Sequence, residues 1–151
     1  MLWEVSMLVQ ILVGASVGAL NIIIHALLTV STIRTARSVA SRKTIRPWGR
    51  LLGIMIAAVL VLMAAHMAEV FVWSAAYALT NAAPDGADLT YFAFVNYTTL
   101  GYGDILPVPR WRLLGPMTAM NGVLLFGWST AVIFEVLRRT IAEHGSFASS
   151  T

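Results

Sequence analysis

The chain has no cysteine and very few charged side chains. The lack of cysteine excludes disulfides and thiol catalysis, and it leaves the redox compartment undetermined. Charged residues make up 11% of the 151 residues, whereas a soluble globular domain carries roughly 25%. Hydrophobic residues make up 58%, and the mean hydropathy is +0.78. This composition predicts an integral membrane protein and leaves no room for a soluble enzyme domain.

Three apolar stretches are long enough to cross a bilayer as helices, which takes about 20 residues each. They run approximately over Val5–Ile33, Leu51–Leu79 and Leu113–Leu137. The chain starts MLWEVSMLVQ, without a basic leader or a small-residue cleavage pattern, so we expect the first stretch to be a retained span. The sequence therefore predicts an all-α membrane protein with three transmembrane helices.

Basic side chains gather beside the spans and predict their orientation. The connection between the first two spans holds Arg34, Arg37, Arg42, Lys43, Arg46 and Arg50, and the third span is followed by Arg138 and Arg139. Because short cytoplasmic loops are enriched in lysine and arginine, we expect the N-terminus outside and the C-terminus in the cytoplasm. The basic loop sets this topology, and the alternative is that it binds anionic lipid. No span repeats arginine at every third position, as a voltage sensor would.

A polar, glycine-rich stretch, VNYTTLGYGDILP, lies at residues 95–107, between two of the spans. It overlaps an apolar run, Leu89–Tyr97, which is too short to span and suits a re-entrant helix. Gly101 and Gly103 flank Tyr102, and glycine readily adopts positive φ, which lets successive carbonyl groups point to one side. Such a column of oxygens, at the negative end of a short helix, replaces the water that a cation loses on entry. The stretch therefore predicts a cation path.

The stretch also resembles the signature of the potassium channel superfamily. The matching residues are Thr98, Thr99, Leu100, Gly101, Tyr102, Gly103 and Asp104. An outer helix, a short aromatic helix, a following proline and an inner helix surround them, and the resemblance covers about residues 51 to 139. It implies an all-α homotetramer, because one pore loop supplies one wall of a four-walled pore, and passive K+ transport rather than an enzyme activity.

The resemblance also implies a role for each filter residue. K+ ions, the only cofactor implied, would bind the carbonyl oxygens of Thr99, Leu100, Gly101 and Tyr102. The hydroxyl group of Thr99 would form the inner site, Gly103 would close the outer end, and Asp104 would lie at the mouth. Tyr102 would point away from the axis and pack against aromatic side chains of the pore helix. The partners implied are further copies of the chain and membrane lipid, with no nucleic acid.

Two positions depart from the family pattern. Leu100 stands where valine is commoner, and Val95 stands where some members have a glutamate that braces the aspartate behind the filter. The first span lies outside the minimal two-helix pattern, and the resemblance does not explain it. The alternatives to a potassium-selective channel are a weakly selective cation channel, a non-conducting membrane scaffold or sensing subunit, and a membrane protein that binds haem or metal through His25 and His66.

The chain is expected to divide into six segments. These are an N-terminal transmembrane helix (1–33), a basic cytoplasmic loop (34–50), an outer transmembrane helix (51–80), an external turn with pore helix and filter (81–110), an inner transmembrane helix (111–139) and a short, frayed cytoplasmic tail (140–151). The compact, alanine-rich chain suggests the inner membrane of a bacterium.

His66 and Glu69 lie three residues apart in the second span, and so on one face of a helix. Ionisable side chains inside a membrane are costly and usually face protein. Our hypothesis is that both brace the back of the pore helix, at Asn96, in place of the glutamate missing at Val95. The alternative is a structural helix–helix contact. A metal site is less favoured, because the sequence brings only two good ligands close together.

A stripe of small and polar residues recurs at helical spacing in the first span. Its members are Gln10, Gly14, Gly18, Asn21, His25 and Thr29. Gly14 and Gly18 form a GxxxG pattern, which lets helices approach closely, and we expect this face to pack on the second span of the same or a neighbouring chain. His25 is interpreted as a packing histidine rather than a haem or metal ligand, although a pair with His66 would be sensitive to pH.

The third span carries candidates for a gate. Gly122 and Gly127 are possible hinges, since helix kinks commonly occur at glycine, and the alternative for both is close packing against the pore helix. Glu135 lies near the cytoplasmic end. Four copies of it would concentrate cations there, and the alternative is that each pairs with Arg138 or Arg139.

Overall fold

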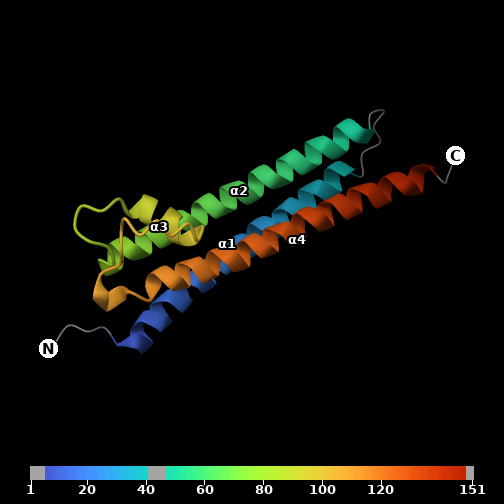
Figure 1. Ribbon diagram of the computed structural model, residues 1–151. Helices are drawn as coiled ribbons and strands as arrows, with labels where there is room; N and C mark the ends of the chain where they lie inside the picture. Colours follow the sequence, from blue (N-terminus) through green and yellow to red (C-terminus); the bar gives the residue numbers. More distant parts are fainter. Residues whose placement is uncertain (1–5, 41–46, 149–151) are drawn as a thin grey trace.

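The structure, a computed structural model, describes residues 6–40 and 47–148 of the chain. Its elements are α1 (Met7–Ala40), α2 (Pro47–Thr80), α3 (Leu89–Tyr97), the 3-10 turn η1 (Pro109–Trp111) and α4 (Leu114–Ala148). The three long helices lie side by side, and the short α3 packs near one end of the bundle (Figure 1). The predicted all-α fold is confirmed: three helices are long and apolar enough to cross a membrane, and the described residues contain no strand.

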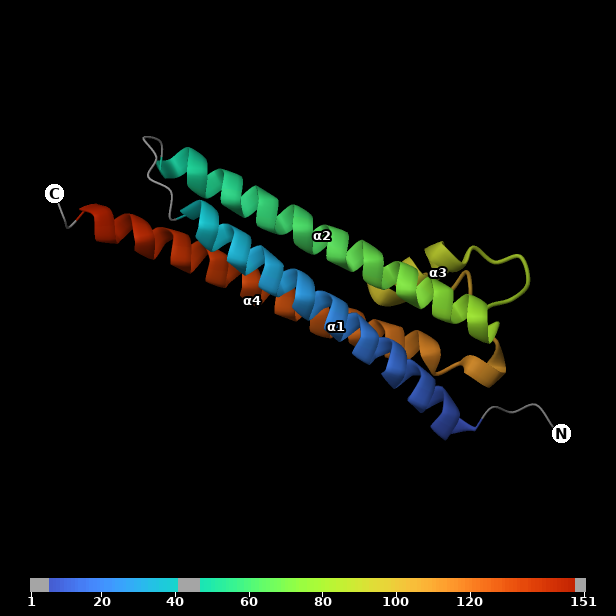
Figure 2. The same ribbon diagram turned by 180° about the vertical axis from the view of Figure 1, so that it is seen from behind.

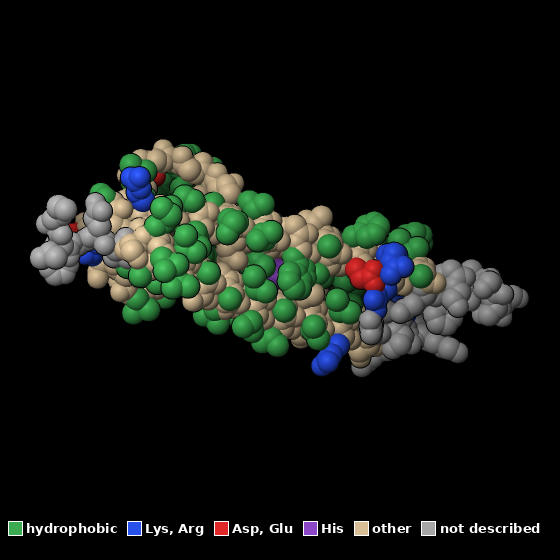
Figure 3. Space-filling view, turned by 90° about the horizontal axis from the view of Figure 1, so that it is seen from below, with side chains coloured by type: hydrophobic (Ala, Val, Ile, Leu, Met, Phe, Trp, Pro, Cys, Tyr) green, Lys and Arg blue, Asp and Glu red, His purple; other side chains and the backbone are tan. Residues whose placement is uncertain are grey.

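The surface agrees with a membrane setting. Hydrophobic side chains cover the middle of the molecule, and charged side chains gather toward its two ends (Figure 3). Many of the exposed side chains on the long helices are large and apolar, including Leu60, Met63 and Phe134. In a bilayer these side chains face lipid or neighbouring protein rather than water.

The helices extend beyond the spans expected from the sequence. α1 continues to Ala40 and α2 begins at Pro47, so much of the expected loop 34–50 is helical, while Arg42, Lys43 and Arg46 lie outside the described residues. Proline is favoured at the first helical position, where its missing N–H group has no partner to lose. α4 continues to Ala148, so most of the expected tail 140–151 is also helical.

The connection from α2 to α3 is set by local backbone chemistry. Asn81 has φ 50° after the last turn of α2, and the Ala82 N–H donates to the Tyr77 carbonyl at 3.0 Å, which closes the helix end. Gly86 turns the chain with φ 77°. Asp88 then caps α3, because its side chain accepts hydrogen bonds from the amides at 90 and 91. The re-entrant helix expected over Leu89–Tyr97 has these bounds in the structure.

The stripe on α1 is buried except for the half-buried Gly18, but it does not pack only on α2. A Cβ atom at Gly14 would meet the Met117 side chain, with its Cε at 2.7 Å, and the nearest atom to one at Gly18 would be Asn121 Nδ2 at 3.7 Å. Both partners belong to α4, whereas Asn21 and His25 of the same stripe contact Glu69 of α2, so the expected packing on the second span is confirmed for part of the stripe and not for its two glycines. Figure 2 shows α1 lying along both α2 and α4. The pattern predicts a close approach but does not identify the partner helix.

Candidate functional site

The C-terminal end of α3 fixes the start of the candidate filter. The amides of Leu100 and Gly101 both donate to the carbonyl of Val95, at 3.0 and 3.4 Å, and the Thr99 amide donates to Asn96 at 3.0 Å. In a trans peptide the carbonyl points opposite to the N–H group that shares its plane. The carbonyl groups of Thr98, Thr99 and Leu100 are therefore directed away from the carbonyls of α3.

The backbone of this stretch alternates in the sign of φ. Thr99, Gly101 and Gly103 have φ values of 59°, 61° and 75°, whereas Leu100 and Tyr102 are not among the residues with positive φ. Glycine adopts this conformation at little cost, but threonine does so only under constraint from its surroundings. The sequence predicts positive φ at the two glycines but gives no sign of it at Thr99.

Every residue from Thr98 to Asp104 is exposed in the single chain. Leu100 is 53% exposed and Tyr102 is 68% exposed. The packing of Tyr102 on aromatic side chains of the pore helix is therefore not found within one chain. An irregular backbone with apolar side chains is left uncovered beside the helix bundle.

Asp104 has a partner that the sequence did not indicate. Tyr91, near the start of α3, donates its hydroxyl hydrogen to Asp104 Oδ2 at 2.7 Å. This hydrogen bond raises the pKa of the Tyr91 hydroxyl, because the bond is lost when the phenol ionises and a second negative charge then lies beside the carboxylate. Val95, where a glutamate would brace the aspartate, is buried and apolar.

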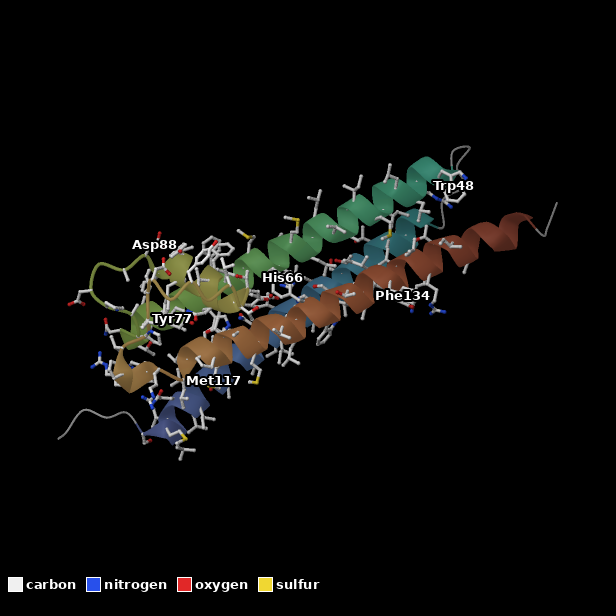
Figure 4. The ribbon with its side chains drawn as sticks, viewed as in Figure 1. Trp48, His66, Tyr77, Asp88, Met117 and Phe134 are labelled. Atoms are coloured by element: carbon white, nitrogen blue, oxygen red, sulfur yellow. The ribbon has the colours of Figure 1, made fainter. Side chains whose placement is uncertain are left out.

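His66 and Glu69 do reach the pore helix, but at Tyr97 rather than at Asn96. His66 Nδ1 lies 2.9 Å from the Tyr97 hydroxyl and 3.0 Å from Glu69 Oε2, and the Tyr97 hydroxyl donates to the same carboxylate oxygen. Figure 4 shows His66 on α2 near α3, whose last residue is Tyr97. Asn96 instead donates to the Phe92 carbonyl at 2.9 Å. Tyr97 is thus the residue that links α2 to the segment before the filter.

α1 and α4 complete this polar contact. His25 Nδ1 lies 2.8 Å from Glu69 Oε1, and Ser129 Oγ lies 2.9 Å from His66 Nε2 and 3.3 Å from His25 Nε2. His25 and Glu69 are fully buried. His25 therefore joins α1 to this contact by hydrogen bonds, and its ring centre lies 5.3 Å from that of His66. Ser129 thus joins the two histidine rings to α4.

A second set of polar side chains lies one turn of α1 further along. Asn21 donates to the Glu69 backbone carbonyl at 3.3 Å and to Asn121 Oδ1 at 3.0 Å, and the Trp73 indole donates to the same oxygen at 3.0 Å. Tyr77 and Thr118 join α2 to α4 through their hydroxyl groups at 2.6 Å. All three long helices are therefore joined to one another by hydrogen bonds at the depth of α3.

The two glycines in the third span differ in their surroundings. A Cβ atom at Gly122 would overlap the carbonyl oxygen of Tyr97 and lie 3.0 Å from its carbonyl carbon, whereas one at Gly127 would meet nothing within 4 Å. Gly122 is therefore a close-packing position against the pore helix. Glu135 pairs with Arg138 at 2.9 Å and with Arg139.

Comparisons with known proteins agree with this geometry. A family model described as "Ion channel" matches residues 65–139, which is about half of the chain and contains α3, the candidate filter and most of α4. No curated protein and no solved structure matches the chain. α1 lies wholly before the matched residues. By its matched segment and its three apolar helices, the chain belongs to the ion channel family and fits a member of the potassium channel superfamily.

Proposed function

We propose that this ion channel conducts K+ passively through a filter formed by Thr98–Asp104 from four copies of the chain. The observation that carries the proposal is the alternating backbone of Thr99, Gly101 and Gly103, which have positive φ. Backbone carbonyl rings of this kind replace the hydration shell of K+. The oxygens of Thr99, Leu100, Gly101 and Tyr102 would be the ligands, and Asp104 would lie at the outer mouth.

The exposure of the filter supports assembly. Irregular backbone at membrane depth is tolerated only where it is buried in protein or lines a water-filled path. One chain leaves all of residues 98–104 exposed. Further copies are therefore needed to cover Leu100 and Tyr102, and a homotetramer places the filters of four chains around one axis.

Orientation and lipid contact form a second part of the proposal. The basic ends of α1, α2 and α4 would lie in the cytoplasm of a bacterial cell, with α3 toward the outside. A groove of about 400 Å³ lies between α1 and α2. Its lining includes Thr32, Ile54, Ala58 and Arg50. The groove would hold an acyl chain of an anionic lipid whose headgroup lies near Arg50. Arg50→Gln is expected to reduce the amount of anionic lipid that stays bound to the purified protein in native mass spectrometry.

The decisive experiment is ion flux from liposomes that contain the purified protein. We expect flux down a K+ gradient and very little down a matched Na+ gradient, and a tetramer in native mass spectrometry. Equal flux of both ions would replace the selective filter with a weakly selective pore. A tetramer without any flux would favour a scaffold, provided that variants opened near Glu135 are also silent.

Two glycines provide a matched pair for this experiment. Gly103 and Gly86 have φ values of 75° and 77°, and a Cβ atom at either would meet nothing within 4 Å. Alanine therefore costs a similar backbone strain at both positions. If the filter conducts, Gly103→Ala abolishes selective K+ flux and Gly86→Ala retains it. Equal effects of the two substitutions would contradict the assignment of residues 98–104 as the ion path.

A further inference from the structure

The strongest unexplained feature is a buried group of side chains from all four helices, His25, His66, Glu69, Tyr97 and Ser129, which we call the His–Glu cluster. The ligand atoms of the two histidines and the glutamate lie within 4.8 Å of one another. The side chains of His25 and Glu69 are 0% exposed, and that of His66 is 15% exposed. In the described part of the chain, the basic side chains within ion-pair distance of Glu69 are these histidines alone.

The two imidazole rings present the same edge to the carboxylate. The Nδ1 atoms of His25 and His66 face Glu69 at 2.8 and 3.0 Å, and their Nε2 atoms face Ser129 at 3.3 and 2.9 Å. One carboxylate and one hydroxyl group therefore face the same pair of rings from opposite edges. Metal-binding histidines usually have this arrangement, in which the second ring nitrogen is held by a hydrogen bond.

A count of hydrogens shows that the cluster has room for a cation. Two neutral imidazoles, the Tyr97 hydroxyl and the Ser129 hydroxyl supply four hydrogens. Five contacts each need a hydrogen. Four of them join a ring nitrogen to the oxygen that it faces, and the fifth joins the Tyr97 hydroxyl group to Glu69. The further contact between His66 and Tyr97 shares one of these hydrogens. One contact is therefore left without a hydrogen, and a buried polar atom that lacks a hydrogen-bond partner is costly. A cation at the Nδ1 atoms removes this conflict.

We propose that the His–Glu cluster binds a divalent transition-metal ion of the zinc type. His25 Nδ1, His66 Nδ1 and a Glu69 oxygen would be its ligands. Two imidazole nitrogens and one carboxylate form a donor set that suits Zn²⁺ and related ions, with a fourth position open to water or to the Tyr97 hydroxyl. Each neutral histidine would carry its hydrogen on Nε2 and donate it to Ser129, whose oxygen has two lone pairs to accept both. Every ring nitrogen then has a partner of the correct kind.

The cluster also has a route to the surface of the single chain. His66 is partly exposed, and a histidine side chain is visible between hydrophobic side chains in the space-filling view (Figure 3). The ring of His66 lies 4.6 Å from that of Phe126, centre to centre. Phe126 belongs to α4 and is itself partly exposed, so rotation of its side chain would open the path to Nδ1.

A metal here would explain why α1 is present. It would join His25 of α1 to His66 and Glu69 of α2. The Glu69 carboxylate is hydrogen-bonded to Tyr97, which lies two residues before Thr99 in the chain. A helix outside the matched family segment would thus be coupled to the base of the candidate filter. The binding itself does not depend on K+ conduction, so failure of either proposal leaves the other to be judged separately.

Metal binding is tested on the full chain in detergent, without a polyhistidine tag, with Co²⁺ as the spectroscopic probe. We expect one Co²⁺ per chain, visible absorption of a tetrahedral nitrogen and oxygen site, and displacement by Zn²⁺. His25→Gln, His66→Gln and Glu69→Gln should each weaken binding by about 100-fold or more, because even loss of an outer hydrogen-bond partner costs about 10–100-fold. Ser129→Ala, which removes such a partner and no ligand, should fall within that smaller range.

His144→Gln is the matched control, because it removes the third histidine of the chain, 15 residues beyond Ser129 on α4. It should leave Co²⁺ binding unchanged. X-ray absorption of the Zn²⁺-loaded wild-type protein needs no variant to fold, and it should show two imidazole ligands with Zn–N distances of about 2.0–2.1 Å. Absence of stoichiometric binding, equal loss in His144→Gln, or a zinc shell without two imidazoles would overturn the proposal. A proton on the cluster would then supply the fifth hydrogen.

Discussion

The end of the bundle that contains α3 and the end where α1 joins α2 are held together by different chemistry. Around α3 the core contains several large aromatic side chains, among them Trp73, Tyr77 and Phe92. The Trp73 indole and the Tyr77 hydroxyl group are hydrogen-bonded to side chains of α4. At the other end the core is aliphatic, and a groove separates α1 from α2. The buried residues of this aliphatic core are Ile54, Ala58, Leu62, Val132 and Val136.

This difference separates a part of the molecule suited to rigidity from a part suited to movement. Buried hydrogen-bond networks fix one arrangement of their partners, because any other leaves polar groups unpaired. Aliphatic contacts tolerate small shifts at lower cost. The candidate filter is attached to the first kind of core, and the end of α4 that carries Glu135 is attached to the second. A gate at that end could therefore open without disturbing the backbone of residues 98–104.

The largest predicted effect compares one core residue from each end. Phe92→Ala is expected to destabilise the chain by about 3–5 kcal/mol, because Phe92 is 1% exposed and lies among aromatic rings that cannot close the cavity. Ile54→Ala should cost only about 2 kcal/mol, the low end for such a change, because Ile54 lines a groove that lipid can fill. Thermal unfolding in detergent with added lipid measures both. Equal costs would remove the distinction between the two cores.

The next prediction concerns the contact between α4 and the pore helix. Gly122→Ala should destabilise the chain by about 1–3 kcal/mol and abolish ion flux, because a Cβ atom there overlaps the backbone carbonyl of Tyr97, which cannot rotate away. Either α3 or α4 must move, and the start of the filter moves with α3. Unfolding and liposome flux are measured on the same preparation.

Gly127→Ala is the control for this prediction, because a Cβ atom at that position meets nothing within 4 Å. It changes the same residue type in the same helix and should be neutral or slightly stabilising, since alanine has the higher helix propensity. Normal flux in Gly122→Ala would mean that α3 and α4 are not held as closely as the structure has them. Loss of flux in Gly127→Ala would instead support a hinge there.

A smaller effect is expected at the hydroxyl group that joins Glu69 to the pore helix. Tyr97→Phe removes a donor to a buried carboxylate and should cost about 1–2 kcal/mol. Flux should also decay faster with time, because the segment before the filter loses its attachment to α2. Tyr77→Phe removes another buried hydroxyl, bonded to Thr118, away from the His–Glu cluster. It should lower stability similarly while leaving the decay unchanged, and the same decay in both variants would contradict bracing through Tyr97.

The lengths of the apolar runs were sufficient to predict the main elements. Three long runs and one short run predicted three spanning helices and the re-entrant helix Leu89–Tyr97, because the bilayer sets a minimum length for a span. Helix ends were harder to predict, since α1 and α4 continue beyond the apolar runs into segments that contain Arg, Thr, Ser and Glu. The glycine spacing likewise indicated where the backbone would leave helical geometry, at Gly101 and Gly103.

The partners of the buried polar residues could not be predicted. Helical spacing shows which residues share a face, but not which helix that face meets. His25 contacts Glu69 44 residues away, and Ser129 contacts His25 104 residues away. Asn96 and Tyr97 differ by one position, which rotates the side chain by about 100° around α3. Bracing was therefore assigned to the wrong neighbour, although His66 and Glu69 were correctly placed behind the pore helix.

The smallest predicted effect lies at Asp104, where the hydrogen bond from Tyr91 is exposed. Tyr91→Phe should leave the free energy of unfolding unchanged. It should alter only the rate at which ion flux decays with time, because it frees the Asp104 carboxylate beside the candidate filter. Since the bond raises the pKa of Tyr91 above its usual value of 10.0, the hydroxyl stays protonated and bonded through mildly alkaline pH. The difference in decay between Tyr91→Phe and wild type should therefore be constant from about pH 7 to 9. A difference that disappears within this range would show that Tyr91 ionises too readily to hold Asp104, and that the filter is supported mainly from behind, through Tyr97.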